Sequence, residues 1–173
     1  MDKKGCIHVY TGDGKGKTTA SIGLAIRAIG AGYKVLFVQF IKNKLSSEHM
    51  ALKKLSPQIE VRQYGFGFIY GNNPSPLDKE IALKGIRDIK EEASKGEYDL
   101  IILDEANVAL HYNLFPLDEL LAVIDNKHPN TELVLTGRYA HSKIIDKADL
   151  VTEMKEIKHY FQKGIKARKG IEE

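Results

Sequence analysis

The most informative segment of the chain is Thr11-Gly12-Asp13-Gly14-Lys15-Gly16-Lys17-Thr18-Thr19. It follows a short apolar segment, Cys6-Ile7-His8-Val9-Tyr10, and it opens a helical pattern that begins Ala20-Ser21-Ile22-Gly23-Leu24. A strand, a glycine-rich turn, a Lys-Thr pair and a helix in this order are typical of a phosphate-binding loop. The backbone N–H groups of such a loop converge on phosphate oxygens, and the helix adds its positive N-terminal end.

Two side chains of the loop are expected to meet the ligand directly, Lys17 by neutralising phosphate charge and Thr18 by holding Mg²⁺ through its hydroxyl. The loop departs from the common G-x-x-x-x-G-K-[ST] pattern at one place, because Thr11 stands where the first glycine usually lies. The loop is therefore a variant, and a nucleotide bound there can sit in an unusual way. A glycine-rich turn without a ligand is the alternative, but the order of the elements favours a phosphate site.

Composition limits the remaining possibilities. A chain of 173 residues suits one domain with a single core, and we expect residues 1–173 to form it. A hydrophobic fraction of 43% and a charged fraction of 28% are those of a water-soluble globular protein, and a net charge of +3 is too small to argue for nucleic-acid or membrane binding. The lone Cys6 excludes an internal disulfide. Without a leader or a long apolar run, we expect a cytoplasmic protein.

Strands alternate with helices along the chain. The segments read as strands are Cys6–Tyr10, Tyr33–Phe40, Ile59–Tyr64 (nearer an edge, because it alternates), Leu100–Leu103 and Leu133–Leu135. Helical spacing marks Leu77–Lys95, and Pro116 in a first turn marks a helix through Ile124. This order predicts an α/β fold, a mostly parallel sheet with helices on both faces. The loops that follow the strands are then expected to share one rim, at residues 11–17, 39–47, 65–76, 104–107 and 136–141.

The segment Leu100-Ile101-Ile102-Leu103-Asp104-Glu105 is an apolar strand that ends in two acids. A carboxylate at a strand end beside a phosphate loop is a suitable ligand for a hard divalent ion that bridges phosphates. An acidic cap for the next helix is the alternative. Spacing leaves open which of Asp104 and Glu105 faces the metal.

The loop Gly65-Phe66-Gly67-Phe68-Ile69-Tyr70-Gly71 places three aromatic residues among glycines. Such side chains are costly to expose to water. The loop therefore either folds back on the core, makes a contact between subunits, or forms an aromatic lid over a flat ligand.

Together these motifs resemble the ATP:corrinoid adenosyltransferases of the CobA/CobO type. The resemblance lies in Val9–Thr19, Val38–Lys42, Leu103–Glu105, Leu135–Arg138, Ala148–Met154, Ile157–His159 and Gly164–Ala167, in the same order along nearly the whole chain. The family typically has Asn where this chain has Asp13, and well-known members have Trp where Tyr70 stands. Many members also carry an extension before the first strand, whereas about five residues precede it here.

The resemblance implies a P-loop fold of the RecA-like kind, usually in a homodimer. The expected reaction transfers the 5′-deoxyadenosyl group of ATP to Co(I) of a corrinoid and releases triphosphate, with ATP reversed relative to ordinary P-loop enzymes. Because the cobalt is the nucleophile, the protein need not supply one. The implied co-substrate is ATP with Mg²⁺ or Mn²⁺, and the implied electron donor is a flavodoxin or a reduced flavin.

The resemblance also implies roles for individual residues. The ATP-binding set is Thr11, Gly12, Asp13, Gly14, Lys15, Gly16, Lys17, Thr18, Thr19 and Arg138, although Arg138 also suits a structural ion pair. Thr18 and Glu105 would hold the metal, with Asp104 one step removed from it. Phe68 and Tyr70 would wedge beneath the corrin ring and expel the lower axial ligand of Co(II), which makes reduction to Co(I) easier.

Two points stay open on the sequence alone. The basic run Lys155, Lys158, Lys163, Lys166, Arg168 and Lys169 is either a solvated face or a segment beside the phosphates or the substrate. A P-loop kinase for a small molecule or nucleoside would share the loop, the acids and the fold, but it would release ADP. A module that binds ATP without using it would not account for the aromatic loop.

Overall fold

The computed structural model describes residues 4–41, 47–65 and 74–172. Its centre is a sheet of six strands: β1 (Ile7–Thr11), β2 (Val35–Phe40), β3 (Ile59–Tyr64), β4 (Leu100–Asp104), β5 (Glu132–Thr136) and β6 (Leu150–Glu153). The strand order is β3-β2-β4-β5-β1-β6, and every neighbouring pair is parallel. The predicted α/β architecture is confirmed, and the expected edge position of residues 59–64 is confirmed as β3.

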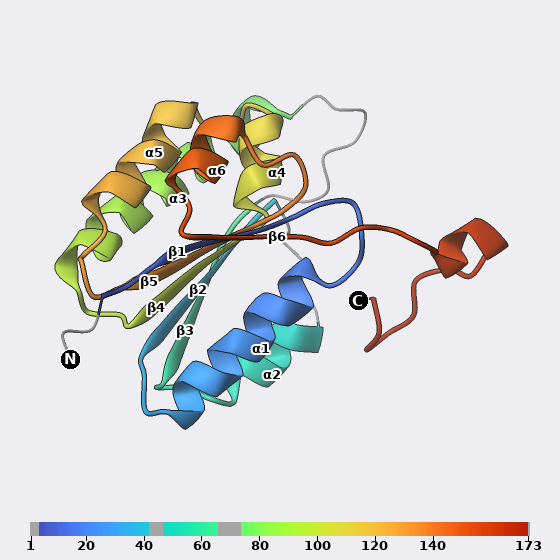
Figure 1. The fold of residues 1–173 in the computed structure, drawn as a ribbon, viewed down its shortest axis with the longest axis horizontal. Coiled ribbons are helices and arrows are strands. Elements are labelled where there is room, and N and C mark those ends of the chain that lie inside the picture. The colour runs from blue at the N-terminus through green and yellow to red at the C-terminus, as the bar shows by residue number, and fades with distance from the viewer. Residues whose placement is uncertain (1–3, 42–46, 66–73, 173) are drawn as a thin grey trace.

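Helices cover both faces of the sheet (Figure 1). The helices α1 (Lys17–Gly30) and α2 (Ser47–Lys53) lie on one face. The opposite face carries α3 (Pro76–Lys95), α4 (Ala106–His111), α5 (Leu117–Asn126) and α6 (Ser142–Lys147). Among the described residues, no helix has both the length and the apolar character needed to cross a bilayer.

The pleat of the central strands divides the core between these two helical layers. The strand β2 is buried throughout, and its Leu36, Val38 and Phe40 pack on the face that α3, α4, α5 and α6 cover. Val35 and Phe37 pack with α1 and the residues around α2. A strand that is buried on both faces consists mostly of consecutive apolar residues, which is why these strands can be predicted from the sequence.

The helices predicted from Leu77 and from Pro116 are both present, and each begins within one residue of the predicted position. The helix α3 starts with a capping box, in which the Ser75 hydroxyl accepts from the Asp78 backbone and the Asp78 carboxylate accepts from the Ser75 N–H. It ends at Lys95 and is capped by Gly96, which adopts the left-handed conformation. Pro116 stands immediately before α5 rather than within its first turn, which is a small correction to the prediction.

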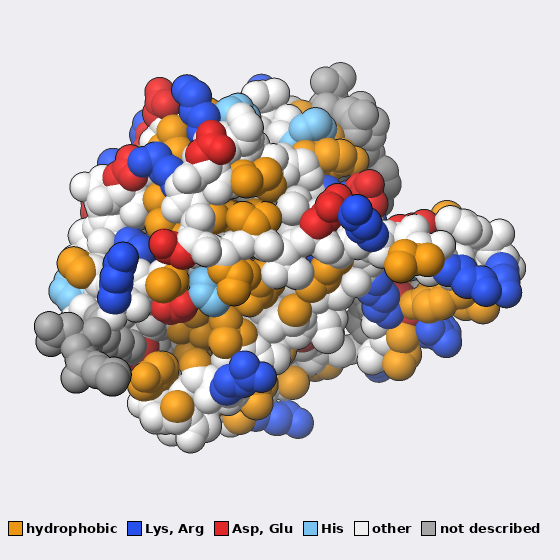
Figure 2. Space-filling model, viewed as in Figure 1, with side chains coloured by type: hydrophobic (Ala, Val, Ile, Leu, Met, Phe, Trp, Pro, Cys, Tyr) orange, Lys and Arg blue, Asp and Glu red, His pale blue; other side chains and the backbone are white. Residues whose placement is uncertain are grey.

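The chain beyond β6 leaves the sheet and projects to one side of the molecule (Figure 1). This C-terminal segment, residues 154–172, contains a short 3₁₀ turn, η2 (Tyr160–Lys163). Figure 2 shows Lys and Arg side chains gathered on the projection, between hydrophobic ones. All six members of the basic run are exposed, and Arg168 pairs with Glu172.

Candidate active site

The phosphate loop connects β1 to α1 and lies against the end of β6. Gly14 N–H donates to the carbonyl of Met154 (2.7 Å), and Met154 N–H donates to the carbonyl of Thr11 (2.9 Å). A Cβ added at Gly12, whose φ is +92°, would lie 2.4 Å from the Met154 oxygen. A Cβ at Gly14 would lie 2.8 Å from the same oxygen. The backbone at Met154 therefore leaves no room for a side chain at Gly12 or Gly14.

Lys17 lies at the centre of this loop. Its side chain is buried, and its ammonium donates to the carbonyls of Gly12 (2.6 Å) and Gly14 (2.7 Å). Burial lowers the pKa of Lys17, and the positive charge of Arg138 acts in the same direction. The Lys17 ammonium thus links two carbonyls of the loop. A phosphate oxygen bound in the loop would compete with these carbonyls for the ammonium.

The Asp104 carboxylate is fully buried and accepts hydrogen bonds from three side chains. The Thr18 hydroxyl (2.9 Å) and the Thr136 hydroxyl (2.7 Å) donate to Oδ1, and Gln39 Nε2 (2.9 Å) donates to Oδ2. These donors come from α1, β5 and β2, so Asp104 ties together the carboxyl ends of the central strands and the start of α1. The spacing of the acidic pair predicts Asp104 but not these partners.

The neighbouring Glu105 has a different environment. It lines the pocket described below, and its backbone adopts the left-handed conformation with φ 61°. That conformation costs a non-glycine residue about 1–2 kcal/mol. Its N–H donates to the Thr136 hydroxyl (3.0 Å), which helps to hold it. Of the two acids, Glu105 is the one that lines the pocket, while Asp104 lies buried behind it.

Arg138 and Asp13 form a pair beside the loop. Arg138 Nη2 donates to the Asp13 carbonyl (2.9 Å), and its Nε lies 3.5 Å from the Asp13 carboxylate. Both side chains are exposed, and both line the pocket. Arg138 thus forms the structural ion pair predicted from the sequence as its alternative role. Its guanidinium nevertheless lies at the pocket wall.

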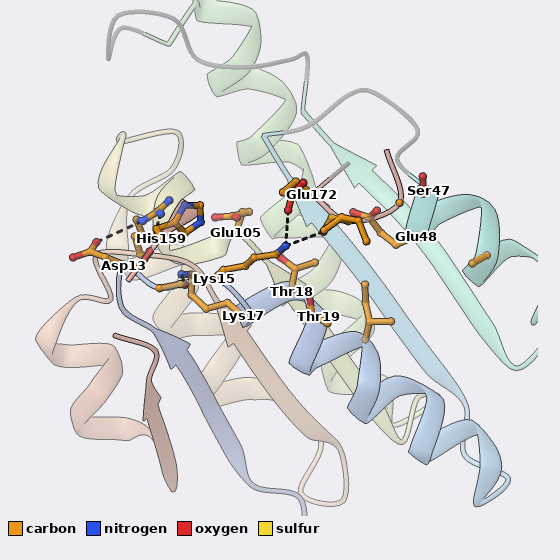
Figure 3. Close-up of a pocket in the computed structure, with 17 residues that line it drawn as sticks. Asp13, Lys15, Lys17, Thr18, Thr19, Ser47, Glu48, Glu105, His159 and Glu172 are labelled. Carbon is orange, nitrogen blue, oxygen red and sulfur yellow. Dashed lines mark hydrogen bonds and ion pairs between the residues drawn. The ribbon is translucent and has the colours of Figure 1, made fainter. Parts of the chain in front are cut away.

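The C-terminal segment returns to the loop through Lys15. The Lys15 ammonium donates to the Tyr160 hydroxyl (2.9 Å), to the Ile171 carbonyl (3.0 Å) and to the Glu172 carboxylate (3.0 Å). Figure 3 marks the bond to Glu172 among its dashed lines. Arg168 and Tyr160 also bond Glu172, and together with Lys15 they hold its pKa well below the usual range. The sequence gives no signal for this carboxylate.

Lys15, Lys17, Glu105, Arg138 and Glu172 line one pocket of about 770 Å³ at the carboxyl ends of the strands (Figure 3). Its wall comprises residues 13–19 and Ile22, then Ser47, Glu48 and Ala51 around α2, then Glu105 and Arg138, and finally His159 and residues 170–172. The expectation that the loops share one rim is confirmed for the described loops. Thr11 and Gly12 do not belong to the wall, because they lie at the end of β1 and against Met154. Phe68 and Tyr70 lie outside the described residues.

Fold and site together define a P-loop protein of the α/β class. The flagellar accessory protein FlaH from Methanocaldococcus jannaschii shares the fold, with a TM-score of 0.57 and 16% identity, over 87% of this chain and 71% of that one. At that identity the likeness concerns the fold alone.

The sequence comparisons are more specific. The model of the family described as ATP:corrinoid adenosyltransferase BtuR/CobO/CobP matches residues 3–172, and the chain belongs to that family. Corrinoid adenosyltransferases from a Sinorhizobium species and from Pseudomonas aeruginosa are 38% and 36% identical to it, over 99% of this chain and 81% and 85% of theirs. The Escherichia coli K12 enzyme of the same name is 35% identical, over 99% of this chain and 87% of its own. The chain is therefore a transferase, and nothing in these matches favours a kinase.

Proposed function

We propose that the chain transfers the 5′-deoxyadenosyl group of ATP to Co(I) of a corrinoid, with the triphosphate of ATP held in the pocket of the phosphate loop. The observation that carries the proposal is the assembly of Lys17, Thr18, Glu105 and Arg138 in one pocket of a chain that belongs to the adenosyltransferase family. Cations and hydroxyls at a loop of backbone N–H groups suit a polyphosphate.

The reaction balances without a nucleophile from the protein. The Co(I) substrate supplies the electron pair, a bond forms from cobalt to C5′, and the bond from C5′ to oxygen breaks. The triphosphate leaves with the pair of electrons from that broken bond. The protein then has two tasks, to hold C5′ in line with the cobalt and to balance the charge that grows on the leaving oxygen.

Three cations are available for the second task. Lys17 is held at the centre of the loop by the carbonyls of Gly12 and Gly14, from which it can turn to a phosphate oxygen. Lys15 and Arg138 stand at the pocket wall, where they can reach the outer phosphates. Their present partners are the tail around Glu172 and the pair with Asp13.

The residues present fit a divalent ion such as Mg²⁺ or Mn²⁺. The Thr18 hydroxyl donates its hydrogen bond to Asp104, so its oxygen lone pairs remain for a cation. The Glu105 carboxylate lines the same pocket. Oxygen ligands of this kind, completed by phosphates and water, are what Mg²⁺ prefers. When bound, the ion would offset charge on the leaving triphosphate.

The reduction of the corrinoid belongs to the same proposal. Family resemblance supports Phe68 and Tyr70 as the aromatic pair that displaces the lower axial ligand of Co(II). A one-electron donor, such as a flavodoxin or a reduced flavin, would then complete the reduction to Co(I). A homodimer, as is usual in the family, is part of the same expectation.

Incubation with ATP, Mg²⁺, cobalamin and a strong reductant tests the proposal. The spectrum should develop the cobalt–carbon product with the wild-type chain. Lys17→Ala should lower the rate by about a hundredfold or more, since it removes charge at the leaving group. Lys84→Ala is the matched control, because Lys84 pairs with Asp88 on the surface of α3, away from the pocket wall. A wild-type rate in Lys17→Ala would reject the proposed site.

A further inference from the structure

One hydroxyl connects the two acidic residues of the site. Thr136 is fully buried at the end of β5. Its hydroxyl donates to Asp104 Oδ1 (2.7 Å) and accepts the backbone N–H of Glu105 (3.0 Å). A single side chain from a neighbouring strand therefore fixes both the buried acid and the acid at the pocket wall.

The direction of the hydrogen bonds around Asp104 follows from their chemistry. The hydroxyls of Thr18 and Thr136 both donate to its Oδ1. Each hydroxyl has one proton. The Thr18 oxygen is thereby left with lone pairs for a cation, and the Thr136 oxygen is left with lone pairs for the Glu105 N–H.

The backbone of Glu105 needs this support. Its left-handed φ of 61° is uncommon for a residue with a side chain and persists when the surroundings hold it. The bond to Thr136 satisfies the N–H of Glu105 in that conformation, next to the fixed position of Asp104. If the bond is lost, Glu105 can relax toward a commoner conformation, and its carboxylate then leaves its place at the pocket wall.

We propose that Thr136 is the positioning residue of the divalent-ion site: through Asp104 it sets the hydroxyl of Thr18, and through the backbone of Glu105 it sets the carboxylate. The inference rests on the proposed function, since that function assigns the ion to Thr18 and Glu105. Thr136 itself touches neither the ion nor ATP. Partners that orient metal ligands in this way commonly contribute a factor of 10 to 100 in metal affinity.

The same sheet offers a matched control. Thr131 is also buried, and its hydroxyl donates to the carbonyl of Tyr98 (2.8 Å), immediately before β5 begins. It therefore lies at the opposite end of the strand from Thr136. Thr131→Val removes a buried threonine hydroxyl and one hydrogen bond without touching the site.

The test measures Mn²⁺ binding to the complex of each full-length variant with ATP, by the paramagnetic resonance of free Mn²⁺. Thr136→Val keeps the shape of the side chain and should weaken Mn²⁺ by about tenfold or more, which is about 1.4 kcal/mol. ATP affinity measured with a chelator present should stay within about twofold, because Thr136 does not contact ATP. Thr136→Ser should restore wild-type affinity. Thr131→Val should lower the melting temperature and leave Mn²⁺ affinity unchanged.

Wild-type Mn²⁺ affinity in folded Thr136→Val, or an equal loss in Thr131→Val, overturns the inference. If Thr136→Val does not fold, Thr136→Cys replaces it, because a thiol fills the space but hydrogen-bonds weakly. Wild-type affinity in Thr136→Cys then also overturns it. A wild-type chain that binds Mn²⁺ and ATP but forms no cobalt–carbon bond rejects the proposed function and leaves the role of Thr136 standing.

Discussion

Replacing Gly12 with alanine tests whether the end of β6 supports the phosphate loop. The new Cβ would lie 2.4 Å from the oxygen and 2.9 Å from the nitrogen of Met154. Those two atoms make the hydrogen bonds to Gly14 and Thr11 that fasten the loop to β6. Because the neighbouring atoms belong to the backbone, they cannot turn aside as a flexible side chain would.

The cost follows from two contributions. An alanine held at a φ of +92° loses about 1–2 kcal/mol. The loss of two backbone hydrogen bonds adds about 1 kcal/mol each. The sum is about 3 kcal/mol, which lowers the melting temperature of a chain of this length by about 6–12 °C. ATP affinity should fall as well, since the displaced loop no longer aims its N–H groups at one point.

Thermal unfolding and an ATP-binding titration measure both effects. Gly23→Ala is the control, because a Cβ at Gly23 meets no heavy atom within 4 Å and the residue lies in the interior of α1. That substitution should stabilise the chain by up to about 1 kcal/mol and leave ATP binding unchanged. A wild-type melting temperature and ATP affinity in Gly12→Ala would mean that the end of β6 does not support the loop.

Three further substitutions separate the roles assigned to the site. Glu105→Gln should raise the half-saturating Mg²⁺ concentration with little change in melting temperature. Asp104→Asn should lower the melting temperature, because an amide nitrogen replaces one of the two oxygens that accept from Thr18, Thr136 and Gln39. The reverse pattern in a Mg²⁺ titration and a melting curve would exchange the roles of the two acids. Glu172→Gln should lower the half-saturating ATP concentration by at most about fivefold. The substitution weakens the ion pair with Lys15 and removes a negative charge beside the proposed triphosphate site. An increased half-saturating concentration in a kinetic titration would mean that Glu172 promotes ATP binding. Phe68→Ala should impair turnover from Co(II) more than turnover from Co(I) prepared chemically, and equal losses from the two starting states would argue against the wedge.

The sequence predicts most of the sheet for a physical reason. Strands buried on both faces, such as β2 and β4, are runs of apolar residues that stand out without any partner. The strand β6 gives no such signal, because it has four residues and all of them are exposed at an edge. The helices α2, α4 and α6 have only six or seven residues, too few to establish a helical period.

In the site, residues that are close together in the sequence are predictable, whereas partners from distant segments are not. The loop and the acidic pair are local patterns, and the structure places Lys17, Thr18, Glu105 and Arg138 in one pocket as the sequence suggests. Gln39 and Thr136 reach Asp104 from other strands, across 65 and 32 positions of the chain. A polar residue inside the apolar run of β2 was a usable signal for Gln39, since a buried amide needs a partner.

The most direct test of the proposed adenosyl transfer is the stoichiometry of its products in one reaction mixture. Wild-type chain, ATP, Mg²⁺ and chemically reduced corrinoid are allowed to react, phosphorus resonances identify the nucleotide products, and the optical spectrum measures the cobalt–carbon product. Adenosyl transfer should yield triphosphate and the cobalt–carbon product in equal amounts, and Lys17→Ala should form neither at a comparable rate. ADP as the phosphorus product, or triphosphate without a cobalt–carbon bond, would contradict it.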